Sequence, residues 1–385
     1  MLKFLKNILP SRRDIVMLAV LLAASSVLYF IDLMPIKNAA EGTKEKAVVL
    51  SVDNNGIDGL YPLNRGSQLL QIKILSGKYK GQIFQANNEL RAQMEFDKIF
   101  VPGDIVLAGI MHNANPETDT VNAQDYYRIN NTLLLFGLFA LLLVLFGGYT
   151  GFSALFSFIF SCLLIWKLVI PLTLHGFNAI FISFTAVVIL SIVIIFLVAG
   201  LTAKGVAALA GSLLGVFAAA VTGWIFTYLF KINGAVMPYA QSLVNSGYEY
   251  LNLSDIYTGA VFLAASGAVM DLAMDIASGI EEVSKSNPSL KFKDLFLSGI
   301  RIGRSVVGTM TTTLLLAYSG GYLTLMMMFS AQGTSPVDFI NNPHVASEIV
   351  KTLVGSFGLI LVAPFTALVG AWIFGKKHSV DENKI

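Results

Sequence analysis

Two carboxylates, Asp271 and Asp275, stand four residues apart inside a long apolar stretch. This spacing places both side chains on one face of a helix. Gly267 and Ser278 extend the same face, and Glu282 continues it toward the end of the stretch. A charged side chain near the centre of a membrane-spanning helix costs roughly 2.5–3.5 kcal/mol on insertion scales. Two carboxylates on one face therefore indicate a specific role.

The chemistry that neighbouring carboxylates can perform is the binding and release of protons or other ions. Groups this close titrate as a coupled pair, and a change in their solvation would load or release a shared proton. Asp271 and Asp275 are therefore our candidates for proton or ion binding. A structural reading is also open, in which hydrogen bonds to neighbouring hydroxyls let the pair lock a helix bundle. Acid–base hydrolysis inside the membrane is a more distant third reading.

A basic and hydroxyl-rich segment follows the carboxylates in the sequence. Antiparallel packing would bring Arg304 within reach of the Asp275 face as a counter-ion. The alternative for Arg304 is a membrane anchor whose guanidinium extends to the surface. Ser305, Thr309 and Thr312 are candidates for relay or substrate contacts, and close helix packing explains them equally well.

The composition places these residues in an integral membrane protein. Of the 385 residues, 55% are hydrophobic and 13% are charged, whereas soluble domains carry about 25% charged residues. The sequence shows no Gly-rich phosphate loop and no common catalytic signature. The four histidines and the single cysteine form no spaced set of metal ligands. We therefore expect no enzyme activity, no catalytic residue, no cofactor, no metal site and no nucleic-acid partner.

Apolar segments of spanning length predict an α-helical polytopic membrane protein with about eight transmembrane helices. An N-terminal anchor helix lies within 1–35, a seven-helix bundle within 129–375, and a tail at 376–385. The seven segments of the bundle cover about 131–148, 152–171, 178–199, 206–230, 256–280, 305–329 and 349–374. Small residues around Gly211 and Gly215 predict a close helix contact.

Residues 36–128 differ in character from the apolar segments. Short β-rich runs at 47–52, 68–75, 81–86 and 104–110 are separated by turn residues. The segment 76–81 is typical of a hairpin loop, and 102–104 of a turn that begins another strand. Together they predict a small all-β, barrel-like domain between the first and second helices.

The distribution of basic residues predicts the orientation in the membrane. With a cytoplasmic N-terminus, the short cytoplasmic segments hold 13 Lys and Arg, and the short external loops hold one, Lys231. Positive residues in short loops favour the cytoplasmic side. We therefore expect both termini in the cytoplasm and 36–128 on the extracytoplasmic side.

Four segments of the sequence carry a family resemblance: LSGKYKGQIFQANNEL, VPGDIVLAG, GAVMDLAMDIASGIEEV and LFLSGIRIGRSVVGTMTTTLLLAYSGG. They resemble the YibE/F family of bacterial membrane proteins over nearly the whole chain. This resemblance implies a multi-pass protein of the bacterial cell membrane and no settled activity. Because members of the family look paired, it also implies a sister YibE/F-like membrane protein, or a homo-oligomer, as a partner.

Residues 267–321 also resemble the central helix pair of the SecD/SecF and resistance-nodulation-division proteins. Asp271 or Asp275 matches the mid-membrane acid of that pair, and Arg304 and Ser305 match the opening of its second helix. The likeness covers a small part of the chain and implies a proton-driven machine with an external domain.

These observations lead to two functional expectations. The first is a proton-coupled secondary transporter, or a proton-powered membrane machine, that acts on an unknown small solute or ion across the lipid bilayer. The alternative is a non-transporting scaffold that presents its external β domain to a binding partner. The two differ in whether Asp271 and Asp275 have to titrate.

Overall fold

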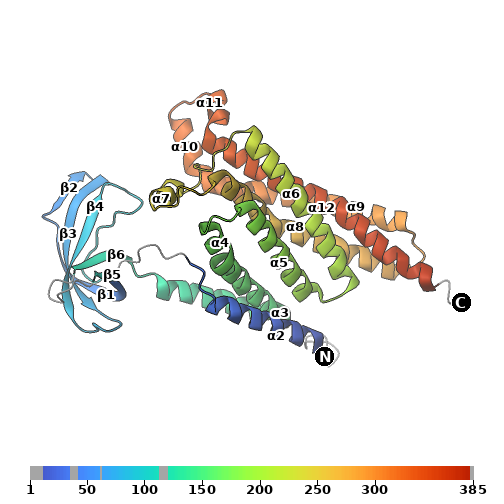
Figure 1. The fold of residues 1–385 in the computed structure, drawn as a ribbon, viewed down its shortest axis with the longest axis horizontal. Coiled ribbons are helices and arrows are strands. Elements are labelled where there is room, and N and C mark those ends of the chain that lie inside the picture. Colours follow the sequence, from blue (N-terminus) through green and yellow to red (C-terminus); the bar gives the residue numbers. More distant parts are fainter. Residues whose placement is uncertain (1–11, 35–41, 61–62, 112–119, 382–385) are drawn as a thin grey trace. The chain divides into compact units, whose positions relative to one another are not determined.

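The computed structural model describes residues 12–34, 42–60, 63–111 and 120–381. The chain divides into two compact units, one comprising 36–142 and the other comprising 1–35 with 143–385. Figure 1 shows that the first unit carries the strands and the second is helical. The predicted fold class, a helical membrane protein with a small β domain, is therefore confirmed.

Six strands form the described sheet of the β unit. They are β1 (Gly42–Asp53), β2 (Ile57–Leu60), β3 (Leu63–Ile74), β4 (Ile83–Arg91), β5 (Ile105–Met111) and β6 (Thr120–Tyr126). Their order is β1-β5-β6-β4-β3-β2, and a further pairing of β1 with β3 closes the sheet into a barrel. Strand β1 makes this possible because a bulge between Val49 and Ser51 lets its first part pair with β5 and its second part with β3.

The predicted β-rich runs are confirmed as β1, β3, β4 and β5, with 76–81 between β3 and β4. The sequence analysis does not predict β2 or β6. Strand β2 has only four residues, and β6 alternates two small apolar residues, Val121 and Ala123, with polar ones. Neither pattern carries enough hydrophobic alternation to be recognised before the partner strands are known.

A buried glutamine, Gln68, links several segments of the barrel by hydrogen bonds in its core. Gln68 is fully buried on β3, and its amide nitrogen donates to Oδ1 of Asn54 at 2.8 Å and to the carbonyl oxygen of Phe100 at 2.7 Å. Its amide oxygen accepts from Nδ2 of Asn88 at 3.1 Å and from the backbone N–H of Phe100 at 3.0 Å. Because every polar atom of Gln68 has a partner, its burial fixes the geometry of the barrel without an unsatisfied group.

The helices of the described residues are α2 (Arg12–Phe30), α3 (Ile129–Leu164), the π-helical turn η2 (Ile165–Val169), α4 (Ile170–Leu174), α5 (Ala179–Ala199), α6 (Ala203–Leu229), α7 (Ala240–Asn245), α8 (Leu253–Ser286), α9 (Phe292–Ser319), the 3₁₀ turn η3 (Gly320–Tyr322), α10 (Leu323–Ala331), α11 (Pro336–Asn341) and α12 (Pro343–Asp381). Across the described ranges, six runs of helix are long and apolar enough to cross a membrane, and Val16–Phe30 is a shorter apolar helix. The six are Ile129–Leu174, Ala179–Ala199, Ala203–Leu229, Leu253–Ser286, Phe292–Ala331 and Pro343–Gly375.

The difference from the predicted count of about eight lies in the first helix and in one broken helix. The predicted spans 131–148 and 152–171 both fall in Ile129–Leu174, which breaks at Gly148 with φ 56° and ψ −128°. A methyl group at Gly151 would lie 2.1 Å from the carbonyl oxygen of Leu143. Eight residues of straight helix span about 12 Å, so this contact shows that the chain turns back sharply at Gly148.

Helix α8 lies at the centre of the packed helices, with α5, α6, α9 and α12 against it. Figure 1 shows α6, α8, α9 and α12 running side by side. The predicted close contact at Gly211 and Gly215 is confirmed, because methyl groups there would lie 2.0 Å from Oγ1 of Thr366 and 2.8 Å from Cβ of Val362. These glycines let α6 and α12 approach closely, as small residues do between membrane helices.

Candidate functional site

Helix α8 carries both predicted carboxylates on one continuous rod. It begins where Oδ1 of Asn252 accepts hydrogen bonds from the backbone N–H groups of Ser254 and Asp255, at 3.1 and 3.2 Å. Its 34 residues correspond to about 51 Å at 1.5 Å per residue, whereas the hydrocarbon core of a bilayer is about 30 Å thick. Asp271 lies about 27 Å from the start of the helix. The carboxylates therefore lie in the half of α8 that is nearer to α9's first residue.

The carboxylate face of α8 points outward from the helical bundle. Asp271 and Asp275 are both exposed, whereas the neighbouring residues of α8 lie in the core. The exposed positions continue along the helix at Ala260, Ala264, Gly267 and Glu282, with Ser278 half-buried. The buried positions between them include Leu272, Ala273, Ile276 and Ala277. The spacing correctly predicts one shared face, and packing turns that face away from α6 and α12.

Helix α9 runs antiparallel beside α8, and two contacts set their register. A methyl group at Gly279 would lie 2.6 Å from Cδ1 of Ile302, and one at Gly303 would lie 3.2 Å from Cδ1 of Ile276. Counting outward from these contacts along the two helices places residue 275 level with residues 304 to 306, and residue 271 level with residues 308 to 310. Residues matched in this register therefore lie at about the same depth along the bundle axis.

Arg304 is level with Asp275 but does not face it. Successive residues of a helix turn by about 100°, so Arg304 lies about 160° around α9 from Ile302, whose side chain packs on α8. Within the part of the chain that the structure describes, Arg304 forms no ion pair with Asp275 or Asp271. The expected contact between Arg304 and the carboxylates is therefore wrong for a single chain.

The predicted hydroxyl residues lie on the exposed side of α9 nearer to α8. Each donates to a backbone carbonyl one turn earlier: Ser305 to Ile302 at 2.7 Å, Thr309 to Val306 at 2.9 Å and Thr312 to Gly308 at 3.1 Å. Their donors are thus used within the helix, while their oxygens can still accept hydrogen bonds. The structure brings these hydroxyls and the carboxylates to one outward surface. Glu282 lies seven residues beyond Asp275, or about 10 Å along α8.

A further pair of charged residues, Glu348 and Lys351, lies near the start of α12 and was not predicted from the sequence. The Glu348 side chain is 19% exposed, and its Oε2 lies 3.6 Å from Nζ of Lys351. This oxygen is buried and has no hydrogen-bond partner among the described residues. Nζ of Lys351 also lies 5.0 Å from the ring centre of Tyr318. The spacing of three between Glu348 and Lys351 within an apolar helix is the sequence signal that would have found the pair.

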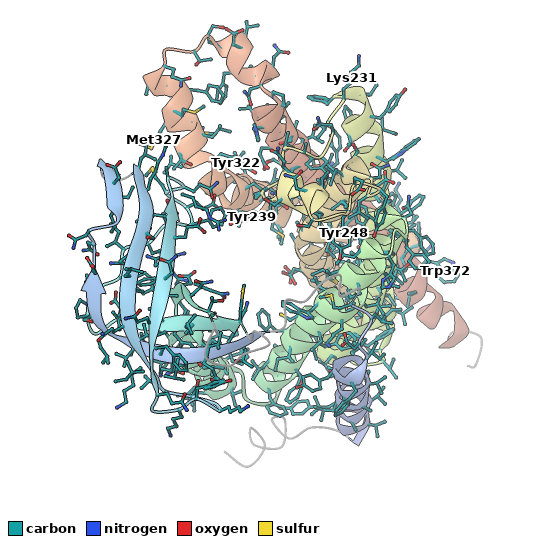
Figure 2. The ribbon with its side chains drawn as sticks, turned by 60° about the vertical axis from the view of Figure 1, so that its left-hand side comes forward. Lys231, Tyr239, Tyr248, Tyr322, Met327 and Trp372 are labelled. Atoms are coloured by element: carbon teal, nitrogen blue, oxygen red, sulfur yellow. The ribbon has the colours of Figure 1, made fainter. Side chains whose placement is uncertain are left out.

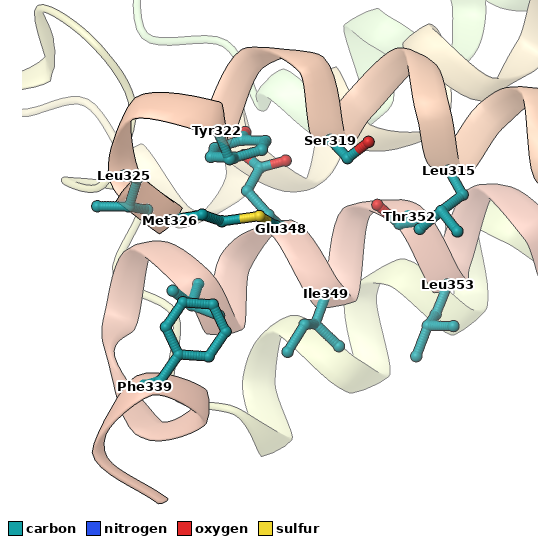
Figure 3. Close-up of a pocket in the computed structure, with 11 residues that line it drawn as sticks. Leu315, Ser319, Tyr322, Leu325, Met326, Phe339, Glu348, Ile349, Thr352 and Leu353 are labelled. Carbon is teal, nitrogen blue, oxygen red and sulfur yellow. The ribbon is translucent and has the colours of Figure 1, made fainter. Parts of the chain in front are cut away.

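Glu348 borders a largely apolar cavity of about 230 Å³. Its lining comes from α9, η3, α10, α11 and α12, and consists of Leu315, Ser319, Tyr322, Leu325, Met326, Phe339, Val345, Glu348, Ile349, Thr352 and Leu353. Figure 3 shows Glu348, Tyr322 and Met326 at this cavity. The carboxylate of Glu348 thus lies beside an apolar cavity with Lys351 as its charged partner, and it is a second candidate for proton binding.

The segment between α6 and α8 carries further aromatic residues. Figure 2 labels Tyr239 and Tyr248 on this segment, and Lys231 just after the end of α6. Lys231 and Tyr239 adopt positive φ angles of 52° and 60°. The short helix α7 lies between the two tyrosines in the sequence.

Comparison with known families decides what kind of protein this is. The profile described as YibE/F-like protein matches residues 135–376, and the profile described as YibE/F family N-terminal domain matches residues 62–126. The chain belongs to the YibE/F family. No curated protein and no solved structure matches it.

The YibE/F match encloses every candidate site residue named above. Asp271, Asp275, Arg304 and Glu348 all fall within the first profile, and β3 to β6 fall within the second. Over the described residues, no group of three His, Cys, Asp or Glu side chains could hold a metal ion. The family match establishes a membrane protein and carries no activity with it, and it does not extend to the SecD/SecF likeness.

Proposed function

We propose that this YibE/F protein is a proton-coupled secondary transporter, or a proton-powered membrane machine, in which Asp271 and Asp275 bind and release protons. The observation that carries the proposal is the pair of carboxylates on the outward face of α8, one helical turn apart. The remaining faces of α8 are packed against α5, α6, α9 and α12. The described helices leave the carboxylate face itself uncovered, so a movement that brought other groups against this face would change its hydration.

The physical basis of coupling is the cost of a charged carboxylate away from water. A charged pair is favoured when its face is hydrated and disfavoured when apolar groups cover it. Because Asp271 and Asp275 lie one helical turn apart on the same face, a change of cover would act on both carboxylates together. Ser305 and Thr309 provide acceptor oxygens on the same outward surface.

The decisive experiment replaces each carboxylate with an amide of the same size. Asp271→Asn and Asp275→Asn keep the shape of the side chain and cannot titrate. We expect both variants to reach the membrane at parental levels and to keep parental thermal stability in detergent, because neutralising a charge on a spanning helix costs no folding energy. Neither variant should complement a deletion of the gene: each should leave in place the pH-dependent growth difference that the deletion produces across a panel of ions, metabolites and drugs at two external pH values.

Glu281→Gln is the matched control on the same helix. Glu281 forms an ion pair with Lys285 at 3.1 Å and does not belong to the outward carboxylate face. This variant should complement the deletion fully. If Asp271→Asn and Asp275→Asn also complement fully, the carboxylates are structural and transport by this pair is excluded.

The scaffold remains a second candidate function, and one observation on the β unit favours it. A polar pocket of about 480 Å³ lies along β4 and β6, with Asn87, Asn122, Gln124 and Phe96 among the residues that line it. The two strands pair in parallel only at Ala86–Val121 and Asn87–Asn122. Amide side chains beside an aromatic ring suit a polar, hydroxyl-rich ligand. Binding by this unit would persist in the Asp→Asn variants.

A further inference from the structure

We propose that the outward face of α8 and α9 is an interface between two copies of this chain, with Asp271 and Asp275 of one copy opposite Arg301 and Arg304 of the other. We call this surface the α8–α9 face and define it by the exposed residues Gly267, Asp271, Asp275, Arg301, Arg304, Ser305, Gly308, Thr309 and Thr312. This inference rests on the placement of charges and does not depend on the proposed transport function.

The α8–α9 face contrasts with the other exposed sides of the bundle. Elsewhere the spanning helices expose large apolar side chains, such as Ile192 on α5, Phe217 on α6 and Ile360 on α12. Trp372 on α12 likewise points outward in Figure 2 and is 55% exposed. These are side chains that suit contact with lipid.

The α8–α9 face differs in character, since it gathers charged, hydroxylated and glycine residues. The exposed apolar residues beside them include Ala260 and Ala264 on α8 and Leu297, Leu315 and Leu316 on α9. Helix α9 buries only Leu295, Gly299 and Gly303, and both of its arginines are exposed. A helix pair that turned this side to lipid would expose Asp271 and several hydroxyls to hydrocarbon. The pattern therefore indicates that protein covers this face.

Charge complementarity at matched depth also favours a second copy of the chain. Asp275 and Arg304 are level with each other and both exposed, yet Arg304 points away from α8, and the two form no ion pair within the described chain. A two-fold axis along the membrane normal keeps every residue at its own depth. Rotation about such an axis would bring α9 of one copy in front of α8 of the other, so that acids meet bases at the same level.

The α8–α9 face also leaves space in which a helix of a second copy could approach closely. Methyl groups added at Gly267 or Gly308 would meet no atom within 4 Å. Both glycines therefore leave open space on the α8–α9 face, where a helix of a second copy could lie against the backbone. Membrane helices associate through such small residues, and polar side chains across the contact add hydrogen bonds.

Disulfide cross-linking in native membranes tests the interface directly. Two differently tagged chains are co-expressed in a Cys162→Ser background, one with Gly267→Cys and the other with Thr312→Cys, which the register places at equal depth. We expect a disulfide between the two tagged chains on mild oxidation. Adding Asp275→Asn to the first chain and Arg304→Gln to the second should lower the cross-linked fraction several-fold, because the paired charges are removed.

Ile192→Cys, on the exposed side of α5, is the matched control. It should give no inter-chain disulfide when it is co-expressed with either the Gly267→Cys chain or the Thr312→Cys chain. The proposal is overturned if the Gly267→Cys and Thr312→Cys chains reach the membrane and remain stable but form no cross-link. It is also overturned if Ile192→Cys cross-links equally well, or if the charge-removing changes leave the cross-linked fraction unchanged. None of these readouts uses transport, so failure of the proposed function leaves the interface test intact.

Discussion

On the β unit, two ion pairs and a backbone hydrogen bond lower the pKa of Asp125. Its Oδ2 lies 3.2 Å from Nζ of Lys98 and 2.8 Å from Nη1 of Arg128. Partial burial by itself raises the pKa of Asp125, but hydrogen bonds from Arg128, from the backbone N–H of Tyr126 and from Lys98 outweigh burial, and the pKa lies below its ordinary value. The folded β unit therefore favours the charged form of this side chain.

This lowered pKa predicts a loss of stability in acid. A carboxylate whose pKa is lower in the folded state stabilises the fold above its unfolded-state pKa, and this contribution is lost as the pH falls through the folded-state value. We expect the hydrogen-exchange protection factors of the β-unit amides in the full chain, which correct for the intrinsic pH dependence of exchange, to fall below about pH 4, and to fall less in Asp125→Asn. Asp58→Asn is the control, because the only hydrogen bond shown for its carboxylate is from the backbone N–H of Gly59. Equal acid sensitivity in the parent and in Asp125→Asn would refute this role.

At the scale of elements, the break in α3 depends on one backbone conformation. Gly148 has φ 56° and ψ −128°, which residues with a Cβ adopt only under strain. The contact between Gly151 and the backbone of Leu143 forms only because the chain turns back at this point. A single residue therefore converts a 46-residue helical run into two segments.

Gly148→Ala should consequently destabilise the helical unit by about 1–3 kcal/mol, the usual cost of such a backbone conformation. The expected readouts are a lower thermal unfolding temperature in detergent and a lower yield in the membrane. Gly147→Ala is the matched control, because a methyl group there would meet only Oγ1 of Thr150, at 3.7 Å. A Gly148→Ala variant as stable as Gly147→Ala would show that the break is not needed.

The packing of α8 and α9 also accounts for the exposure of the candidate site residues on these two helices. Helix α8 packs against four neighbouring helices and exposes one stripe of residues along its length. Helix α9 packs one side against the bundle and exposes the side that carries its arginines and most of its threonines. Each helix alone has the periodicity of a surface helix in a soluble protein. In a membrane, that periodicity indicates protein or water opposite the polar side rather than lipid.

For the whole molecule, the distribution of charge predicts the orientation in the membrane. The short segments assigned to the cytoplasm hold 13 basic residues and the short external loops hold one, so Lys80 should be outside, and Lys204 and Asn287 inside. Single cysteines at these positions in a Cys162→Ser background would be treated with an impermeant thiol reagent in intact cells. Only Lys80→Cys should react, and all three should react after the membrane is permeabilised. Labelling of Asn287→Cys in intact cells would reverse the orientation.

The sequence by itself determined the features that depend on local pattern. Hydrophobic runs of spanning length predicted the helices, alternation predicted β1, β3, β4 and β5, and a spacing of four placed Asp271 and Asp275 on one face. These features follow from repeats of 3.6 and 2 residues, which neighbouring residues set among themselves. Motifs along the chain likewise indicated the YibE/F family, which the profile matches confirm.

Tertiary structure alone decided which way each face points. The outward direction of Asp271 and Asp275, and the position of Arg304 on the far side of α9, depend on which helices pack on which side. The pairing of β1 with β3 and the cavity beside Glu348 likewise join segments far apart in the chain. Periodicity fixes which residues share a face of a helix, but only contacts between distant segments decide whether that face is buried or exposed.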